Sequence, residues 1–277
     1  MIMAAKKNKM KIGIVGCGAI GSRIAYSIGH ELKHVCRLSG LYDIDQQKAY
    51  ALQKKLSLKG VVKQSLTDLL KDCDCMVEAV NAKDTHPMIE EALQRQRHVL
   101  AMSVGKLLKS QDLFKLARKN RRALLIPSGA IAGIDAIKSA SLVGIKKITL
   151  TTRKPPQGFK DNPYLRKKKI NLRNIRKETV LFEGHVNQAV RFFPQNINVA
   201  ATLALASFAG NKLLIRILTS PRYKINSHQV ELSGPFGRIQ TQTDNVVCPD
   251  NPKTSYLAVL SGIQTLKQFC SGIYMGT

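Results

Sequence analysis

The chain has 277 residues, of which 44 are Lys or Arg and 18 are Asp or Glu, so its formal net charge is +26. This length predicts two domains, each with a full hydrophobic core. The charge makes nucleic acid or an acidic membrane a partner to consider, but the basic residues are spread along the chain, aromatic residues are few and Trp is absent. We therefore expect a solvated surface that attracts small anions, with no specific nucleic acid and no membrane as partner.

The sequence has no apolar run of signal-peptide or membrane-span length. Its six cysteines lack the paired C-x-x-C spacing of zinc and redox sites, and they stand at positions 17, 36, 73, 75, 248 and 270. The first four lie in or beside predicted core strands, which indicates buried thiols in a reducing cytoplasm. No histidine has metal-ligand spacing with a partner, so we expect no metal site.

A glycine-rich stretch near the N-terminus organises the first half of the chain. Residues 12–15 read as a buried strand and residues 19–28 as a helix, with three glycines where strand turns into helix. In this context Gly16 permits the tight turn, Gly18 lets the backbone approach a pyrophosphate, and Gly21 lets the helix pack closely on the strand. The helix N-terminus supplies N–H groups for the phosphates. The residues expected to bind a dinucleotide are Gly16, Gly18, Ala19, Ile20 and Gly21.

An acidic residue follows the second predicted strand. Residues 36–42 are strand-like and end at Asp43, which lies 22 residues after Gly21. An acid at this distance accepts the ribose hydroxyls of NAD and repels the 2′-phosphate of NADP. The expected cofactor is NAD or NADP, and Asp43 favours NAD.

Strands and helices alternate from here to residue 127. The predicted helices cover residues 46–58, 65–71, 85–95 and 110–120, and the predicted strands cover residues 75–80, 98–102 and 122–126. Such alternation is typical of an α/β domain with a doubly wound parallel sheet of the Rossmann type, whose ligands bind at the carboxyl ends of the strands.

The pattern changes after about residue 134. Helices are predicted at 135–143, 196–210 and 252–269, and strands at 147–153, 213–218, 225–232 and 238–243. These elements indicate a second α+β domain with a largely antiparallel sheet and helices on one face. Residues 160–177, rich in Lys and Arg, read as a solvated loop or excursion. We expect residues 1–127 with 246–277 to form the dinucleotide-binding domain, and residues 128–245 to form the catalytic and dimerisation domain.

One histidine of the second domain is placed by strand alternation. His228, Val230 and Leu232 fall on one face of the strand at 225–232, so His228 points inward or into a cleft. The pattern leaves two interpretations open, a hydrogen-bonded core histidine or a catalytic one. The other five histidines are weaker candidates for catalysis.

Several motifs together resemble those of the L-aspartate dehydrogenase family over nearly the full length of the chain. Besides the glycine-rich stretch, they are Pro127-Ser-Gly-Ala-Ile-Ala-Gly-Ile-Asp-Ala136, Thr152-Arg-Lys-Pro-Pro156, Phe193-Pro-Gln-Asn-Ile-Asn-Val-Ala-Ala201, Asn226-Ser-His228, Gly234-Pro-Phe-Gly237 and Asn251-Pro-Lys-Thr-Ser255. The glycine motif is common to many families, whereas the later motifs in this order are much more specific.

The resemblance implies oxidative deamination of L-aspartate with NAD or NADP. The product is iminoaspartate, which hydrolyses to oxaloacetate and ammonia or supplies NAD biosynthesis. By the same resemblance, His228 is the catalytic acid/base, and Ala130 and Asn198 contact the nicotinamide end of the cofactor. An imidazole suits this role, because the substrate ammonium must lose a proton before hydride can leave the α-carbon.

A dicarboxylate substrate also needs cationic or amide donors. Lys253, Thr254 and Ser255, at the start of the last predicted helix, are candidates, with Arg153 and Lys154 as less favoured ones. A sheet with one uncovered face often pairs with a copy of itself, so we expect a homodimer.

Two alternatives remain open. The first is another two-domain NAD(P)-dependent dehydrogenase of the sugar, inositol or homoserine type. Sugar and inositol enzymes share a Glu-Lys-Pro where this chain has Ser103-Val-Gly-Lys106, which disfavours them. The second is a non-catalytic NAD-binding regulator that binds DNA. The segment 160–177 is also more cationic than the family resemblance leads us to expect.

Overall fold

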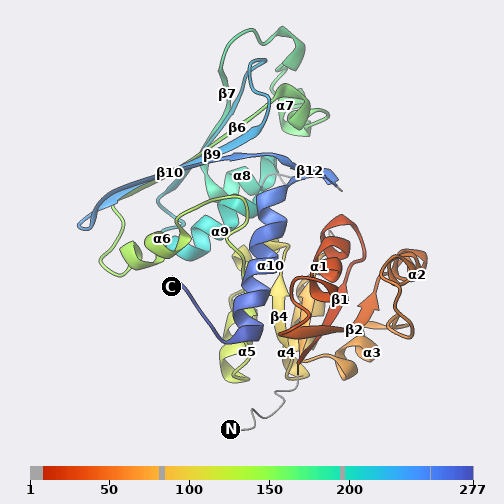
Figure 1. Cartoon of the computed structure of the whole chain (residues 1–277). Helices are drawn as coiled ribbons and strands as arrows, with labels where there is room; N and C mark the ends of the chain where they lie inside the picture. The colour runs from red at the N-terminus through yellow and green to blue at the C-terminus, as the bar shows by residue number, and fades with distance from the viewer. Residues whose placement is uncertain (1–8, 81–84, 194–196, 250, 277) are drawn as a thin grey trace. The chain divides into compact units, whose positions relative to one another are not determined.

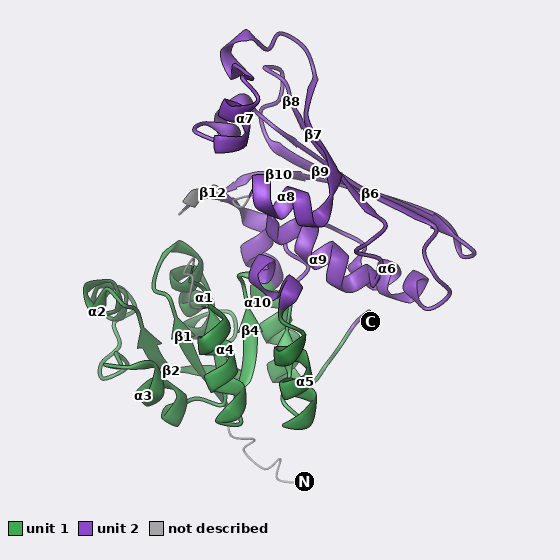
Figure 2. Ribbon diagram, turned by 180° about the vertical axis from the view of Figure 1, so that it is seen from behind, with its two compact units in different colours: residues 1–103, 110–126, 262–274 green, residues 104–109, 127–261, 275–277 purple. Residues whose placement is uncertain are grey.

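The computed structural model describes residues 9–80, 85–193, 197–249 and 251–276, with only the backbone given for residues 251–253. The chain forms two compact units (Figure 2). Unit 1 contains residues 1–103, 110–126 and 262–274, and unit 2 contains residues 104–109, 127–261 and 275–277.

This division differs from the expected domains at residues 104–109, 246–261 and 275–277, and at Pro127. Residues 246–261 group with unit 2, where the Ser261 hydroxyl accepts a hydrogen bond from the Gly129 N–H at 3.0 Å. Residues 104–109 also group with unit 2, because the Gly105 N–H donates to the side-chain oxygen of Asn198 at 2.9 Å. Both contacts join residues far apart in the sequence, which local patterns do not reveal.

Unit 1 contains a five-stranded parallel sheet in the order β2-β1-β3-β4-β5 (Figure 1). The strands are β1 (Met10–Val15), β2 (Cys36–Tyr42), β3 (Cys75–Glu78), β4 (His98–Ala101) and β5 (Leu124–Leu125). All four residues of β3 are buried, so both faces of the sheet are covered, as a doubly wound fold requires. This confirms the predicted Rossmann-type architecture.

The helices of unit 1 follow the strands as predicted. They are α1 (Ala19–Gly29), α2 (Gln46–Lys55), α3 (Leu66–Asp72), α4 (Thr85–Gln94) and α5 (Gln111–Lys119). The Ser65 hydroxyl caps α3 by accepting from the Asp68 N–H at 3.1 Å. Helix α2 stops three residues before its predicted end, because Ser57 adopts a left-handed backbone conformation with φ +54°.

Unit 2 contains a second five-stranded sheet in the order β10-β9-β6-β8-β7. Its strands are β6 (Lys147–Lys154), β7 (Thr179–His185), β8 (Leu213–Thr219), β9 (Asn226–Gly234) and β10 (Gly237–Asn245). Only β6 and β8 run parallel, so the prediction of a largely antiparallel sheet is confirmed. Strand β7 was not predicted, because a bulge between Val180 and Phe182 breaks its alternation.

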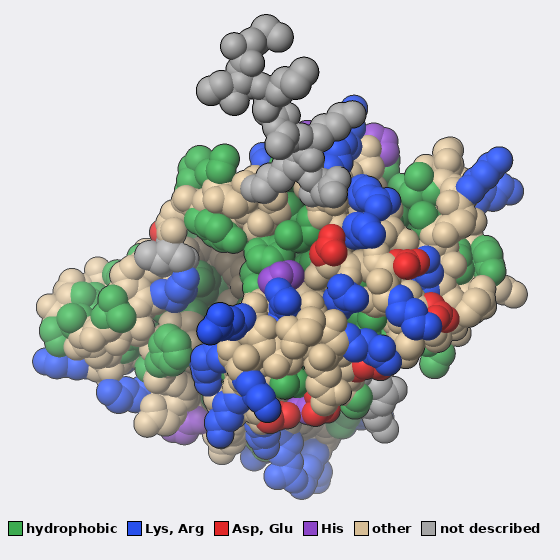
Figure 3. Space-filling view, turned by 90° about the horizontal axis from the view of Figure 1, so that it is seen from below, with side chains coloured by type: hydrophobic (Ala, Val, Ile, Leu, Met, Phe, Trp, Pro, Cys, Tyr) green, Lys and Arg blue, Asp and Glu red, His purple; other side chains and the backbone are tan. Residues whose placement is uncertain are grey.

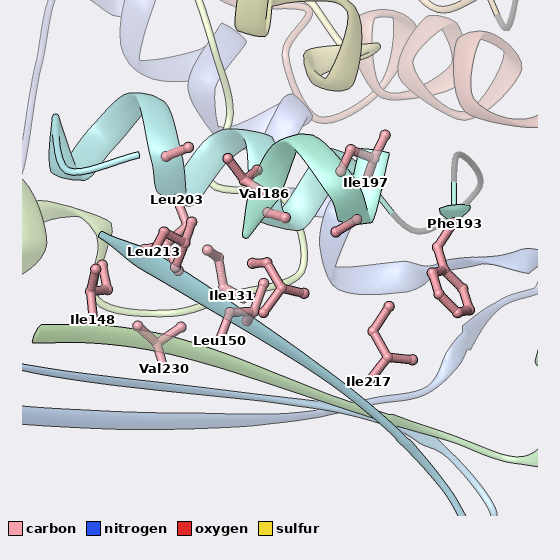
Figure 4. Close-up of a cluster of buried hydrophobic side chains, with 14 of the residues drawn as sticks. Ile131, Ile148, Leu150, Val186, Phe193, Ile197, Leu203, Leu213, Ile217 and Val230 are labelled. Atoms are coloured by element: carbon pink, nitrogen blue, oxygen red, sulfur yellow. The ribbon is translucent and has the colours of Figure 1, made fainter. Parts of the chain in front are cut away.

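Helices α6 (Ile134–Ser141), α8 (Val186–Phe192) and α9 (Ile197–Ser207) lie on one side of this sheet (Figures 1 and 2). Figure 4 shows their apolar side chains meeting those of the strands, with Leu203 of α9 above Leu213 of β8, and Ile148 and Val230 nearby. The labelled residues are buried. The small residues of α9 allow it to lie close to the strands, which fixes the helix over the sheet.

Most of residues 160–177 are exposed, as predicted, but the segment between β6 and β7 also contains short helices. It forms the 3₁₀ helix η2 (Pro156–Phe159), the short helix α7 (Pro163–Lys167) and the 3₁₀ helix η3 (Leu172–Asn174). Phe159, Leu165 and Ile175 are buried in the core of unit 2, at 2%, 3% and 8% exposure. The burial of these three residues could not be predicted from the sequence, because each apolar side chain stands among lysines and arginines.

The last predicted helix, at residues 252–269, begins later than expected. Residues 251–255 form strand β12 (Asn251–Ser255), which pairs with β11 (Val247–Cys248), and helix α10 runs from Tyr256 to Ser271. Pairing of Val247 with Ser255 holds the first residues in an extended conformation, so the helix cannot start at Pro252. The 3₁₀ helix η1 (Val104–Lys109) completes the elements that position the site.

All six cysteines are free, and five of them are buried, which confirms the predicted burial of the four cysteines in or beside the first strands. Burial raises the pKa of the Cys73 thiol to about 11. Within the described residues no helix has the length and apolarity needed to cross a bilayer, and no three His, Cys, Asp or Glu side chains gather as a metal site requires.

Candidate active site

In the glycine-rich turn of unit 1, the surroundings of each of the three glycines differ. Gly16 has φ +96°, and a Cβ on it would lie 2.5 Å from the carbonyl oxygen of Ala79. A Cβ on Gly21 would lie 1.8 Å from the Gly16 carbonyl oxygen, so α1 can pack on the turn only without a side chain there. Gly18 differs, because among the described residues no atom outside its two chain neighbours lies within 4 Å of the position of its Cβ. The space beside Gly18 is therefore open to a ligand.

The same turn begins helix α1. Gly18 is its N-cap residue and gives no side-chain hydrogen bond to the first turn, and no acidic residue stands in that turn. Ala19 and Ile20, the first two helical residues, are half-buried. The N–H groups of the first turn and their partial positive charge are thus available to an anion beside Gly18.

Asp43 lies directly after β2, as predicted, and is fixed against the turn. One carboxylate oxygen accepts from the Cys17 N–H at 2.7 Å, and the other accepts from the Asp45 N–H at 2.9 Å. Each oxygen keeps a second lone pair, which a sugar diol can use. Burial and the nearby Asp43 charge raise the pKa of the Cys17 thiol to about 12, so Cys17 stays neutral beside the turn.

Sequence analysis missed a buried carboxylate at the same edge of the sheet. Glu78 is fully buried at the end of β3, and its carboxylate accepts from the Ser103 hydroxyl at 2.8 Å, the Ser103 N–H at 3.0 Å and the Val80 N–H at 3.1 Å. Burial raises the pKa of Glu78. These bonds tie together the chain segments that leave β3 and β4. The available signal was an acid inside an otherwise apolar strand.

In unit 2, His228 lies on the inner strand β9, opposite Thr152 of β6 and Thr243 of β10. Its Nδ1 lies 3.0 Å from the Thr152 hydroxyl oxygen, and the residue is only 5% exposed. Val230 and Leu232 are buried as well, which agrees with the predicted face of the strand. Burial, with a smaller contribution from the charge of Lys154, lowers the pKa of His228 to about 3. The imidazole is therefore neutral, with one nitrogen held by a threonine.

The Ala130 loop is fastened to the same strands. The carbonyl oxygen of Ala130 accepts from the Thr243 hydroxyl at 2.7 Å and from the Asn245 side-chain amide at 3.2 Å. The Thr243 hydroxyl also lies 3.5 Å from the His228 carbonyl oxygen. Thr243 thus joins Ala130 and His228 in one hydrogen-bond network. Sequence analysis missed Thr243 and Asn245, because only the pairing of β9 with β10 brings them there.

The structure distinguishes between the two cations at the C-terminal end of β6, Arg153 and Lys154. Lys154 lies two residues after Thr152, so its side chain shares the face of His228, and burial lowers the pKa of Lys154 to about 8. Arg153 points to the opposite face, where its guanidinium donates to the Gln229 side-chain oxygen at 2.9 Å and lies 3.7 Å from the Glu178 carboxylate. Lys154 rather than Arg153 is the cation near His228.

The remaining predicted residues lie elsewhere in unit 2. Asn198 is exposed near the start of α9, and its side-chain oxygen accepts from Gly105 of η1. Lys253, Thr254 and Ser255 lie on strand β12 and not in a helical first turn. Thr254 and Ser255 are half-buried, and the side chain of Lys253 lies outside the described residues. The structure therefore joins Ala130 and His228 through Thr243 and gives Asn198 a separate partner.

Comparisons with known proteins give the same picture for each half of the chain. Residues 16–127 match the family model described as the NAD binding domain of homoserine dehydrogenase, and residues 135–269 match that of the C-terminal part of aspartate dehydrogenase. Among solved structures, aspartate dehydrogenase from Thermotoga maritima aligns with a TM-score of 0.72 at 22% identity, covering 97% of this chain and 100% of its own. That likeness concerns the fold.

Curated relatives extend the match to the whole sequence. L-aspartate dehydrogenase from Methanosarcina barkeri is 40% identical over 271 residues, covering 97% of this chain and 100% of the relative. The enzyme from Methanosarcina mazei is 39% identical over 272 residues with the same coverage. Identity at this level over both complete chains places the protein: it belongs to the L-aspartate dehydrogenase family.

Proposed function

We propose that this protein catalyses the NAD(P)-dependent oxidative deamination of L-aspartate to iminoaspartate, which then hydrolyses to oxaloacetate and ammonia. The observation that carries the proposal is the 40% identity to an L-aspartate dehydrogenase over that relative's full length. The chemistry of both units agrees with it. Unit 1 offers a glycine-rich turn suited to a dinucleotide, and unit 2 offers a neutral buried imidazole beside a lysine.

The residues of unit 1 fit a dinucleotide. We assign the pyrophosphate to the turn formed by Gly16, Gly18, Ala19, Ile20 and Gly21. The open space at Gly18 and the uncapped N-terminus of α1 support this assignment. The Asp43 carboxylate accepts the ribose hydroxyls and disfavours a 2′-phosphate, so NAD is the preferred cofactor. When bound, the nicotinamide ring accepts the hydride that leaves the substrate α-carbon.

His228 is the acid/base in this proposal, and Ala130 and Asn198 contact the nicotinamide end of the cofactor. The substrate ammonium must lose a proton before hydride can leave, and a neutral imidazole can accept it. With its pKa of about 3, His228 is a weak base as long as Lys154 is its main charged neighbour and no substrate is bound. Two substrate carboxylates bring negative charge, which raises the imidazole pKa. His228 thus becomes a stronger base when aspartate is bound.

Lys154 is the cation that we assign to a substrate carboxylate. It shares the face of His228, and its pKa of about 8 leaves it largely protonated at pH 7. Lys253, Thr254 and Ser255 remain further candidates for the second carboxylate. The substitution Lys154→Gln removes one charge-assisted contact and is expected to raise KM for L-aspartate about tenfold. Steady-state kinetics at saturating NAD measures this change, and an unaltered KM would remove Lys154 from the site.

The central experiment compares wild type with His228→Ala. Loss of the acid/base is expected to lower kcat by at least about 100-fold. The KM for NAD should stay within twofold, because unit 1 is unchanged. A variant that retains most of its turnover would show that another group takes the proton. A screen of NAD and NADP against aspartate, glutamate, alanine, homoserine and inositol tests the substrate, and a preference for any compound other than aspartate contradicts the proposal.

We further propose that the protein is a cytoplasmic homodimer and that iminoaspartate supplies NAD biosynthesis. Helices α6, α8 and α9 lie on one side of the sheet of unit 2, and the opposite side, with the half-buried Gln229 and Glu231, supports pairing of two copies. Sedimentation equilibrium tests the dimer, and a monomer at micromolar concentration contradicts it. Growth of a deletion strain with and without a pyridine precursor tests the biosynthetic role.

A further inference from the structure

The basic excursion, defined as residues 160–177 of unit 2, carries charge that the proposed reaction does not use. It contains eight basic residues and one acidic residue, Asp161. The basic residues are Lys160, Arg166, Lys167, Lys168, Lys169, Arg173, Arg176 and Lys177. Figure 3 shows more Lys and Arg than Asp and Glu side chains on the face that it presents.

These cations lack carboxylate partners within the described residues, although other lysines and arginines of the chain have them. Two guanidinium groups bond to main-chain carbonyls instead. Arg166 donates to the carbonyl oxygen of Asp161 at 3.3 Å, and Arg176 donates to that of Arg173 at 2.6 Å. The positive charge of the excursion is therefore not neutralised by its own surroundings.

Packing, and not charge pairing, holds the excursion in place. Phe159 meets the Phe193 ring edge-on, with centroids 6.1 Å apart, and Leu165 is buried in the same core. The Asn162 side chain caps α7 by accepting from the Leu165 N–H at 3.1 Å, and its amide donates to the Phe192 carbonyl oxygen at 3.0 Å. Like charges are thus kept close together by apolar anchors. Their mutual repulsion is relieved when an anion binds among them.

The excursion also surrounds a hollow of about 730 Å³. Four exposed cations line it, namely Lys160, Arg166, Lys169 and Arg173, together with the single carboxylate of Asp161. Pro156, Ile170 and Leu172, all half-buried, give it apolar walls. This volume falls in the range of sites for small molecules, roughly 300–1,000 Å³. The lining suits a ligand with an apolar body and several negative charges.

From this hollow we propose that the basic excursion binds a small molecule with several phosphate groups, of the class of nucleoside triphosphates. Four cations against one carboxylate match the charge of a triphosphate, and lysine and arginine are the usual phosphate ligands. The apolar walls contact the body of the ligand. A nucleic acid strand fits less well, because the half-buried Tyr164 ring is already stacked on Phe192 at 4.4 Å and lies 5.5 Å from Phe193. This site is independent of the proposed dehydrogenase reaction.

The test uses ATP as the probe and isothermal titration calorimetry of the full chain at physiological salt. In the double variant Lys160→Glu/Arg173→Glu, two cations of the hollow are reversed, and affinity should fall at least about tenfold. The matched control Lys115→Glu/Lys119→Glu changes the net charge equally on exposed positions of α5, and its affinity should stay within twofold of wild type. Equal losses in both variants would show attraction to net charge only and overturn the proposal. Circular dichroism confirms that each variant is folded.

A footprint locates the bound ATP, since the glycine-rich turn of unit 1 also accepts phosphates. Mass spectrometry measures the rate at which each lysine is acetylated. At saturating ATP this rate should fall at least about threefold at Lys160 and Lys169, because the bound ligand covers them. The rate at Lys115 should not change. Inorganic triphosphate should bind more weakly than ATP, and equal affinity would overturn the role of the apolar walls. Unchanged acetylation of Lys160 and Lys169 in the presence of ATP would overturn the proposal. Binding of duplex DNA without binding of ATP would overturn it as well.

Discussion

The two units build their candidate sites from different parts of the chain. In unit 1 the turn assigned to the phosphates is main chain, because Gly16, Gly18 and Gly21 leave room and the N-terminus of α1 supplies N–H groups. In unit 2 it is made of side chains, because the imidazole of His228 bonds to a threonine 76 residues away in the sequence, Thr152. The first site depends on local backbone conformation, and the second depends on the register of paired strands.

This difference determines how each site responds to change. A shift of one residue in the pairing of β9 would move His228 to the other face of the sheet. A one-residue shift in strand pairing in unit 1 would leave the glycine-rich turn intact, because its three glycines lie within six consecutive residues. Substitutions can therefore separate steric effects in unit 1 from hydrogen-bond and charge effects in unit 2.

The largest expected effect is steric and falls on unit 1. Gly21→Ala places a methyl carbon 1.8 Å from the Gly16 carbonyl oxygen, so we expect a loss of more than about 3 kcal/mol in the free energy of unfolding. Gly18→Ala meets no atom within 4 Å from the described residues beyond its chain neighbours, and it should change stability by at most about 1 kcal/mol. Urea unfolding of both variants measures the contrast. Similar stabilities would contradict the packing assigned to Gly21.

Gly18→Ala has a second consequence, for binding. Its methyl group occupies the open space that we assign to the pyrophosphate, so affinity for NADH should fall at least about tenfold while the fold is kept. A fluorescence titration of NADH measures the affinity. Unchanged binding would place the phosphates elsewhere.

The next effect is electrostatic and falls on unit 2. The pKa of His228 is about 3 in the folded chain and 6.5 in an exposed histidine. Below pH 6.5 the unfolded chain takes up a proton that the folded chain refuses until about pH 3. The stability that neutral His228 contributes is thus present above pH 6.5 and is lost as the pH falls toward 3, at roughly 1.4 kcal/mol per pH unit.

The variant His228→Gln isolates this effect, because it lacks the titrating group. The difference in unfolding free energy between wild type and variant should change by about 2 kcal/mol from pH 7 to pH 5, in the direction that disfavours wild type at pH 5. Denaturant unfolding at several pH values gives the difference. A constant difference would mean that His228 titrates normally in the folded chain.

The same contrast between the units decides what the sequence could predict. The strand, turn and helix around Gly18, and Asp43 after β2, follow from local patterns, and all lie where expected. The face of His228 follows from alternation within one strand. Its partners Thr152 and Thr243 do not, because they depend on which strands are neighbours. The apolar anchors of the basic excursion were hidden for a similar reason, since Phe159 and Leu165 meet the core only through the tertiary fold.

A smaller effect is expected at Thr243. Thr243→Val keeps the shape of the side chain and removes the hydroxyl that donates to the Ala130 carbonyl oxygen. We expect a loss of about 1 kcal/mol in the free energy of unfolding, the usual value for one hydrogen bond. The Asn245 amide still bonds to Ala130, so the loop stays in place and the loss is limited. Thermal unfolding measures it, with Thr241→Val, which removes the hydroxyl bonded to Ala132, as the matched variant.

The smallest expected effect is on catalysis, at Arg153. Its neighbour Lys154 shares the face of His228, whereas the Arg153 guanidinium bonds to Gln229 on the opposite face. Arg153→Gln should therefore change kcat and KM for L-aspartate by less than twofold, the scale expected of a partly exposed ion pair on the surface. Lys154→Gln, which makes the same change in charge one residue away, is expected to raise KM about tenfold. If the two variants lose activity equally, the substrate responds to overall charge, and the strand register no longer distinguishes its ligand.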